Sequence, residues 1–139
     1  MATRHMEPGL QLKATGNIPP NRIVKLVAGT DHGCTVSASA TSPNIGTSQQ
    51  GTRRAPGTGD DDGYAAISGE TIGVYGPGSG CPRVELGGTV AVGDWLTADS
   101  NGAAITTTTE GNSCIGWALE AGVAGDLIEY VSQPCTLAT

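Results

Sequence analysis

Short runs of alternating apolar and polar residues recur along the sequence. Residues 83–86 alternate a charged with an apolar side chain, and residues 89–92 place valine at every second position. A period of two residues is typical of a β-strand that buries one face. Both runs therefore predict strands.

Turn residues separate these runs. Gly87 and Gly88 lie between the two predicted strands, and Asn101 and Gly102 follow them. An Asn-Gly pair favours a type I′ hairpin turn, which needs positive φ at both central positions. Residues 83–105 therefore predict a meander of short antiparallel strands, which needs further strands around it to be stable.

Other parts of the chain supply candidates for those strands. We find no stretch with the length and caps of a three-turn helix, although residues 118–121 would also fit one helical turn. The sequence therefore predicts an all-β fold with little helix. The further predicted strands are residues 22–27, 35–40, 44–47, 64–67, 71–75, 103–109, 113–119 and 126–131.

Two segments have little capacity to form a core. Residues 1–21 are mostly polar and contain Pro19 and Pro20, which hold an extended shape, so we expect an extended N-terminal arm. Residues 47–63 contain almost no apolar side chain, which predicts a long loop. The expected organisation is an arm over residues 1–21, a β-rich domain over residues 22–135 and a tail over residues 136–139.

The net charge of the chain limits the classes of partner that it can bind by electrostatic attraction. The formal net charge is -6, and this argues against electrostatic binding to nucleic acid or to an anionic membrane. The sequence has no apolar run long enough for a membrane span and no recognisable signal peptide. We expect a soluble protein whose partners include neither nucleic acid nor a membrane.

The four cysteines are widely spaced and form no C-x-x-C pair. Four cysteines allow three disulfide pairings, which the sequence does not rank. We expect buried thiols in a reducing compartment, with a disulfide as the alternative. The residues concerned are Cys34, Cys81, Cys114 and Cys135.

Residues 31–34 bring Asp31, His32 and Cys34 close together in the sequence. These groups could form a nucleophilic site or half of a zinc site. The other histidine, His5, lies in the predicted arm, and a turn at Gly33 explains the run adequately. We therefore expect no catalytic residue and no metal site here.

Two further motifs resemble ligand sites only in composition. Residues 60–63 hold three aspartates and a glycine but lack the alternating ligands and closing glutamate of a calcium loop. Residues 76–80 are rich in glycine but lack the lysine and the following helix of a phosphate loop. A solvated acidic loop and a turn are the expected structures, so no cofactor is predicted.

A short internal similarity links residues 90–96 and 123–128, which share the order valine, alanine, glycine, aspartate and an apolar strand. In each segment glycine permits a turn, and aspartate can bond nearby backbone amides. Two related β units would explain the similarity, and so would two hairpins that use the same turn residues.

Several of these segments, in this order, resemble the capsid decoration (cement) proteins of tailed phages, and the resemblance covers about residues 15–132. It implies a small antiparallel β-barrel, β-tulip or sandwich with an extended arm and a long loop, bound to the outer surface of an icosahedral head. It further implies a homotrimer that ties neighbouring major capsid protein subunits together, in virions assembled in the host cytoplasm. The segments are residues 17–26, Ile45 with Gly46, residues 86–99, Asn101 with Gly102, and residues 115–119.

Under this resemblance the arm and the long loop are the expected contacts to the shell. Two tryptophans in apolar strands, Trp95 and Trp117, are expected in the trimer contact or in the core. The expected capsid-binding residues are Asn17, Ile18, Pro19, Pro20, Arg53 and Arg54.

Two other functions fit the sequence less completely. A virion-surface or tail-associated β module that binds host carbohydrate would use an exposed aromatic patch. A small hydrolase built on His32 and Cys34 is the least supported, because no further catalytic partner is found.

Overall fold

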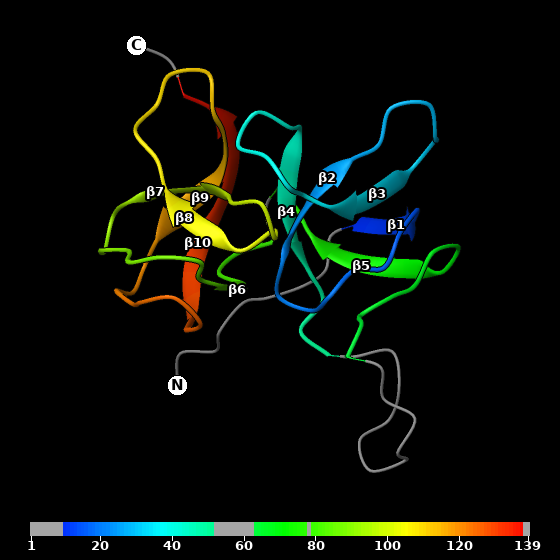
Figure 1. The fold of residues 1–139 in the computed structure, drawn as a ribbon, viewed down its shortest axis with the longest axis horizontal. Coiled ribbons are helices and arrows are strands. Elements are labelled where there is room, and N and C mark those ends of the chain that lie inside the picture. Colours follow the sequence, from blue (N-terminus) through cyan, green and yellow to red (C-terminus); the bar gives the residue numbers. More distant parts are fainter. Residues whose placement is uncertain (1–9, 52–62, 78, 138–139) are drawn as a thin grey trace.

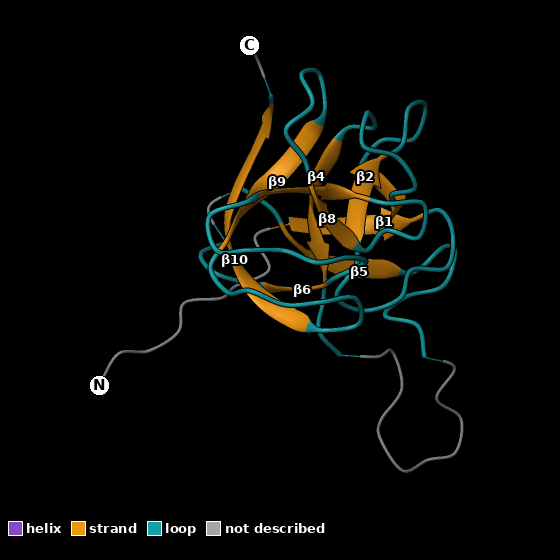
Figure 2. Ribbon diagram, turned by 60° about the vertical axis from the view of Figure 1, so that its left-hand side comes forward, coloured by secondary structure: helices purple, strands orange, loops and turns teal. Residues whose placement is uncertain are grey.

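The computed structural model describes residues 10–51, 63–77 and 79–137, and within these residues it contains strands and turns but no helix (Figures 1 and 2). The prediction of an all-β fold with little helix is confirmed. In chain order the strands are β1 (Leu10–Ala14), β2 (Ile23–Leu26), β3 (Gly33–Val36), β4 (Asn44–Ser48), β5 (Thr71–Tyr75), β6 (Arg83–Glu85), β7 (Trp95–Ala98), β8 (Ala104–Thr106), β9 (Ser113–Ala118) and β10 (Leu127–Thr136).

The first half of the chain forms a closed barrel with the strand order β1-β3-β2-β4-β5. Its strand pairs are antiparallel, except that β1 runs parallel to β3. Pairing of β1 with β5 joins the first and the last strand of the barrel and so closes it. Closure removes the exposed strand edges that an open sheet would present to other chains.

The second half forms a five-stranded antiparallel sheet with the order β6-β10-β9-β7-β8. It lies beside the barrel, with β4 of the barrel between the two halves in Figure 1. The C-terminal strand β10 is the longest and pairs with both β6 and β9.

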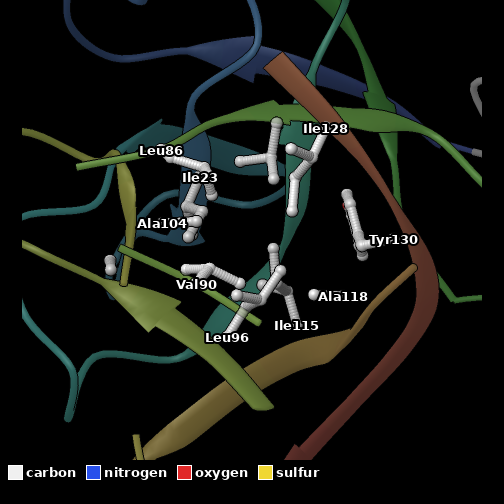
Figure 3. Packing of buried hydrophobic residues seen from close by; sticks show 11 residues of the cluster. Ile23, Leu86, Val90, Leu96, Ala104, Ile115, Ala118, Ile128 and Tyr130 are labelled. Atoms are coloured by element: carbon white, nitrogen blue, oxygen red, sulfur yellow. The ribbon is translucent and has the colours of Figure 1, made fainter. Parts of the chain in front are cut away.

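Each half has its own buried apolar cluster. One cluster fills the barrel and includes Val24, and the other lies under the five-stranded sheet and includes Tyr130 (Figure 3). Ile23 of β2 belongs to the cluster under the sheet, although its neighbour Val24 belongs to the barrel. Because neighbouring side chains of a strand point to opposite faces, β2 contributes to both cores.

Polar contacts also join the two halves. Arg22 at the start of β2 forms an ion pair of 2.6 Å with Glu85 of β6 and donates a hydrogen bond of 2.9 Å to the carbonyl oxygen of Asn101. The side-chain nitrogen of Asn44 on β4 donates to the carbonyl oxygen of Ser113 on β9 at 3.3 Å. The barrel and the sheet are therefore held together by polar bonds as well as by apolar packing.

The described residues include no helix long and apolar enough to cross a membrane. This finding concerns residues 10–51, 63–77 and 79–137 alone.

The predicted arm contains a strand. Residues 10–14 form β1, in which Leu12 and Ala14 are buried while Gln11 and Lys13 are exposed. This alternation places one face of β1 in the barrel core. Residues 1–9 lie outside the described part of the chain, so an arm over them stays a prediction.

The predicted boundaries of the loop and the tail also differ from the observed ends of β4 and β10. The predicted loop over residues 47–63 begins inside β4, because Thr47 and Ser48 are buried strand residues. Residues 52–62 lie outside the described part. At the other end, β10 continues through Thr136, one residue beyond the predicted domain.

One strand prediction and one turn prediction were wrong here. Val92 lies in a turn and is 65% exposed, so residues 89–92 do not form a strand and only Val90 makes an isolated bridge. In the β7–β8 hairpin Gly102 has positive φ, but Asn101 does not, which excludes a type I′ turn. Instead the Asp99 carboxylate accepts hydrogen bonds from the backbone amides of Asn101 and Ala103, at 2.8 and 3.0 Å, and orders a longer turn.

Candidate interaction surface

The two sequence segments that resemble each other form the same turn. The Asp94 carboxylate accepts a hydrogen bond of 2.9 Å from the backbone amide of Ala91, and Asp126 accepts one of 2.9 Å from Val123. The glycine before each aspartate has a φ near +90°, which only glycine adopts readily. The internal similarity therefore corresponds to one turn geometry built twice.

An isolated antiparallel bridge joins the chain segments that precede the two turns. Val90 and Gly122 exchange both of their backbone hydrogen bonds, at 2.9 and 3.0 Å. The amide of Gly93 also donates to the carbonyl oxygen of Ala118 at 2.8 Å. The second turn instead bonds to Leu86, whose carbonyl oxygen accepts from the amide of Gly125 at 2.8 Å. This bonding fixes the backbone of both turns, which extend from the bridge in opposite directions.

Large apolar side chains are exposed on and beside these turns. We call this group the turn patch, and its members are Val92 (65% exposed), Val123 (55%), Leu127 (48%) and Leu119 (41%). Among the described residues, Leu26 on β2 is the other large apolar side chain of comparable exposure. Several exposed large apolar side chains on two hydrogen-bonded turns mark a candidate contact surface.

Carboxylates accompany the turn patch. Asp94 and Asp126 accept backbone hydrogen bonds within the turns, and Glu120 accepts one of 2.8 Å from the amide of Glu129. These bonds fix the carboxylates next to the apolar side chains. An apolar centre with a charged rim is the usual arrangement of a protein contact, and here the rim would suit a basic partner.

The sequence did not identify the turn patch as a site. Val92 fitted an alternating strand pattern, Leu119 and Leu127 lay in predicted strands, and Val123 lay in the segment between those two strands. The signal that could have identified it was the repeated Gly-Asp pair, because each pair marks a turn in which the two residues before the glycine are exposed.

The two tryptophans stack on each other. Trp95 of β7 and Trp117 of β9 are directly paired, with ring centroids 4.3 Å apart and ring planes inclined by 37°. Both are half-buried and belong to neither buried cluster. Their strand neighbours Leu96 and Ala118 point into the core, so the rings lie on the outer face of the sheet.

The predicted capsid contacts have different environments. Asn17 is exposed, and Pro19 and Pro20 are half-buried. Ile18 is fully buried in the barrel cluster and bridges to Ala66, so the prediction of a capsid contact by its side chain was wrong. Backbone hydrogen bonds of Ile18 with Ala65 and Ala66 hold this segment in place, and the Ile18 side chain packs inward. Arg53 and Arg54 lie outside the described residues.

The structure separates the groups of residues 31–34. Asp31 and His32 are exposed in a turn, whereas Cys34 is fully buried in the barrel core. Burial raises the pKa of the Cys34 thiol to about 11, so the thiol stays protonated near neutral pH. A buried, protonated thiol is a poor nucleophile, which argues against a catalytic role for Cys34.

The other motifs lie partly outside the described part of the chain, which lacks residues 60–62 of the acidic run and residue 78 of the glycine-rich loop. Within the residues that are described, no group of three or more potential metal ligands comes together.

Comparison with known proteins shows the fold of the chain. No family model and no curated protein matches the sequence. Among solved structures, the chain is similar to the head fiber gp8.5 N base in bacteriophage phi29, with a TM-score of 0.59 and 20% sequence identity. The similarity covers 94% of this chain and 97% of that one, so it includes both the barrel and the sheet.

Proposed function

We propose that the chain is a structural protein of a phage particle that attaches to the outside of the icosahedral head. There it stabilises contacts between major capsid protein subunits, and it acts as a homotrimer. This role needs no catalytic centre and no cofactor.

The observation that carries the proposal is the shared fold. A structure described as the base of a phage head fiber has the same architecture over nearly the whole length of both chains. The resemblance of residues 15–132 to capsid decoration proteins is an independent argument, because it rests on sequence motifs. Both resemblances support the proposal that this chain attaches to a phage head.

The structure offers two contact regions for this role. The turn patch is apolar and exposed, and we propose that it contacts the major capsid protein. The Trp95–Trp117 pair lies on the outer face of the sheet, where a second copy of the chain could cover it. A contact made by a few side chains is weak by itself. Repeated over a whole shell, such contacts together give strong resistance to disruption of the shell.

The test is co-sedimentation of the purified protein with heads that lack it, combined with light scattering of the free protein. We expect saturable binding at a ratio fixed by the symmetry of the shell, and a free mass of three chains. Heads already saturated with the protein are the control and should bind no more. Absence of saturable binding to expanded heads would refute attachment, and a monomer both free and bound would refute the trimer.

The tryptophan pair favours one second candidate function, which is binding of host carbohydrate at the virion surface. Partly exposed aromatic rings can stack on sugars, and the two rings present such a surface. Binding to a glycan array that Trp117→Ala abolishes would support this function. If the array shows no binding, carbohydrate recognition is excluded.

A further inference from the structure

Two of the four cysteines face each other across neighbouring strands. Cys135 of β10 is the direct partner of Cys114 of β9 in the antiparallel ladder. Residues opposite each other in such a ladder have Cα atoms about 4.5–5.5 Å apart and side chains on the same face. This separation lies within the range of about 4.4–6.8 Å that disulfide bonds span.

An irregularity in β10 brings the two cysteines into register. The pairing of β10 with β9 shifts between Ser132 and Cys135. The skipped positions are Gln133 and Pro134, and proline has no amide hydrogen to donate to the ladder. Beyond the shift, Cys135 lies opposite Cys114, and Thr136 lies opposite Ser113.

The Cys135 side chain also lies close enough to influence the Cys114 thiol. The pKa of Cys114 is raised to about 11, mainly by burial and to a smaller extent by the charge and hydrogen bonding of the neighbouring Cys135 thiol. The remaining cysteines lie elsewhere: Cys34 faces Ala14 and Leu26 in the barrel, and Cys81 precedes β6.

We propose that Cys114 and Cys135 are a site of oxidative modification at which a disulfide reagent such as oxidised glutathione forms an intramolecular cross-strand disulfide. This is one of the three pairings allowed by four cysteines, and it requires no change of strand register. The site does not depend on attachment of the protein to a phage head.

The partly exposed Cys135 reacts first, because Cys114 is fully buried. The Cys135 thiolate attacks one sulfur of oxidised glutathione, and one glutathione thiolate leaves as the mixed disulfide forms. The Cys114 thiol then loses its proton to solvent and attacks the Cys135 sulfur, which releases the second glutathione. Two protein thiols are oxidised, and one glutathione disulfide is reduced to two thiols.

The bond would fasten the C-terminal end of β10. Beyond the irregularity this end is paired with β9 only through Cys135 and Thr136 within the ladder. A covalent link at that point holds the short paired segment in place and shortens the unfolded chain.

The experiment oxidises the full-length protein with a glutathione redox series, traps free thiols and maps peptides by mass spectrometry without reduction. We expect one linked peptide pair containing Cys114 and Cys135, an intact mass lower by two hydrogens, and free thiols at Cys34 and Cys81. The oxidised protein should melt higher than the reduced one by about 5–10 °C.

Cys135→Ser and Cys81→Ser form a matched pair of variants, because both cysteines are half-buried. Cys135→Ser should abolish the link and the melting shift, whereas Cys81→Ser should retain both. A linked peptide with any other pairing, or a link between two chains, would overturn the proposal. Peptide mapping of the unaltered protein is enough to decide the pairing. The test therefore remains valid even if one of the variants does not fold.

Discussion

The hydroxyl groups of Thr47 on β4 and Tyr130 on β10 form a hydrogen bond of 2.9 Å, buried where the barrel meets the sheet. Both residues are fully buried. Burial raises the pKa of Tyr130 well above its usual range, although the bond to Thr47 partly opposes this shift. The neutral phenol thus joins one half of the molecule to the other.

Removing either hydroxyl should destabilise the protein. Tyr130→Phe leaves the Thr47 hydroxyl buried without this partner, and we expect the free energy of unfolding to fall by about 1–2 kcal/mol. Thr47→Val should have a similar effect. Because the two groups bond to each other, the double variant should lose less than the sum of the single variants. Urea denaturation of the four proteins measures this coupling, and strictly additive losses would contradict it.

Alkaline solution should weaken the fold through its buried thiols. The pKa of Cys34 is raised by burial from 9.0 to about 11, so its neutral form stabilises the folded state. This contribution is complete below pH 9, the pKa of the unfolded thiol, and it is lost as the pH rises through about 11.

The check is urea denaturation of the reduced protein at about pH 8 and about pH 10.5. The free energy of unfolding should fall between these values, and Cys34→Ala should reduce the fall. Cys81→Ala is the control, because Cys81 is only half-buried, and it should leave the fall unchanged. Equal pH dependence in all three proteins would exclude Cys34 as a source.

Gly46 should tolerate no side chain. A Cβ atom at this position would lie 1.9 Å from the carbonyl oxygen of Tyr75 on β5, which is backbone and cannot move aside. Gly46→Ala should therefore separate β4 from β5, and we expect a loss of more than about 3 kcal/mol or an insoluble protein. Gly51→Ala is the control, because a Cβ there meets nothing within 4 Å. Thermal melting of both variants tests this, and equal melting temperatures would contradict the steric argument.

The turn patch should contribute to binding of phage heads. Val92→Asp combined with Val123→Asp places charges at exposed positions, so the melting temperature should change little. If the patch contacts the shell, head binding should weaken about tenfold or more in co-sedimentation. Leu26→Asp alters a residue of similar exposure, 43%, on the barrel and should bind normally. Equal binding by all three proteins would remove the patch from the contact.

The alternation of residues predicted most strands because each strand buries one face. The same signal was present in residues 10–14, but the polar composition around them favoured an arm. Closure of the barrel by β1 could not be predicted, since it depends on pairing with β5, where Leu10 is paired with Val74 and Lys13 with Thr71 far along the chain. Local patterns carry no information about such distant partners.

The two Ile-Gly motifs of the resemblance have a structural cause that the sequence alone does not reveal. Gly46 meets the carbonyl of Tyr75, and a Cβ at Gly116 would lie 1.7 Å from the carbonyl oxygen of Val131. Both glycines therefore allow a close approach of paired strands. The turn patch was not predicted because Val92 continued an alternating strand pattern in the sequence. In the structure, Gly93 and Asp94 turn the backbone at this point instead.

Strand β2 makes the two halves of the molecule depend on each other. Ile23 serves the core under the sheet, and Val24 serves the core of the barrel. A slip of β2 by one residue would exchange the faces of both side chains and spoil both cores together. The barrel and the sheet should therefore gain and lose structure as one cooperative unit, without a stable intermediate in which only one of them is folded.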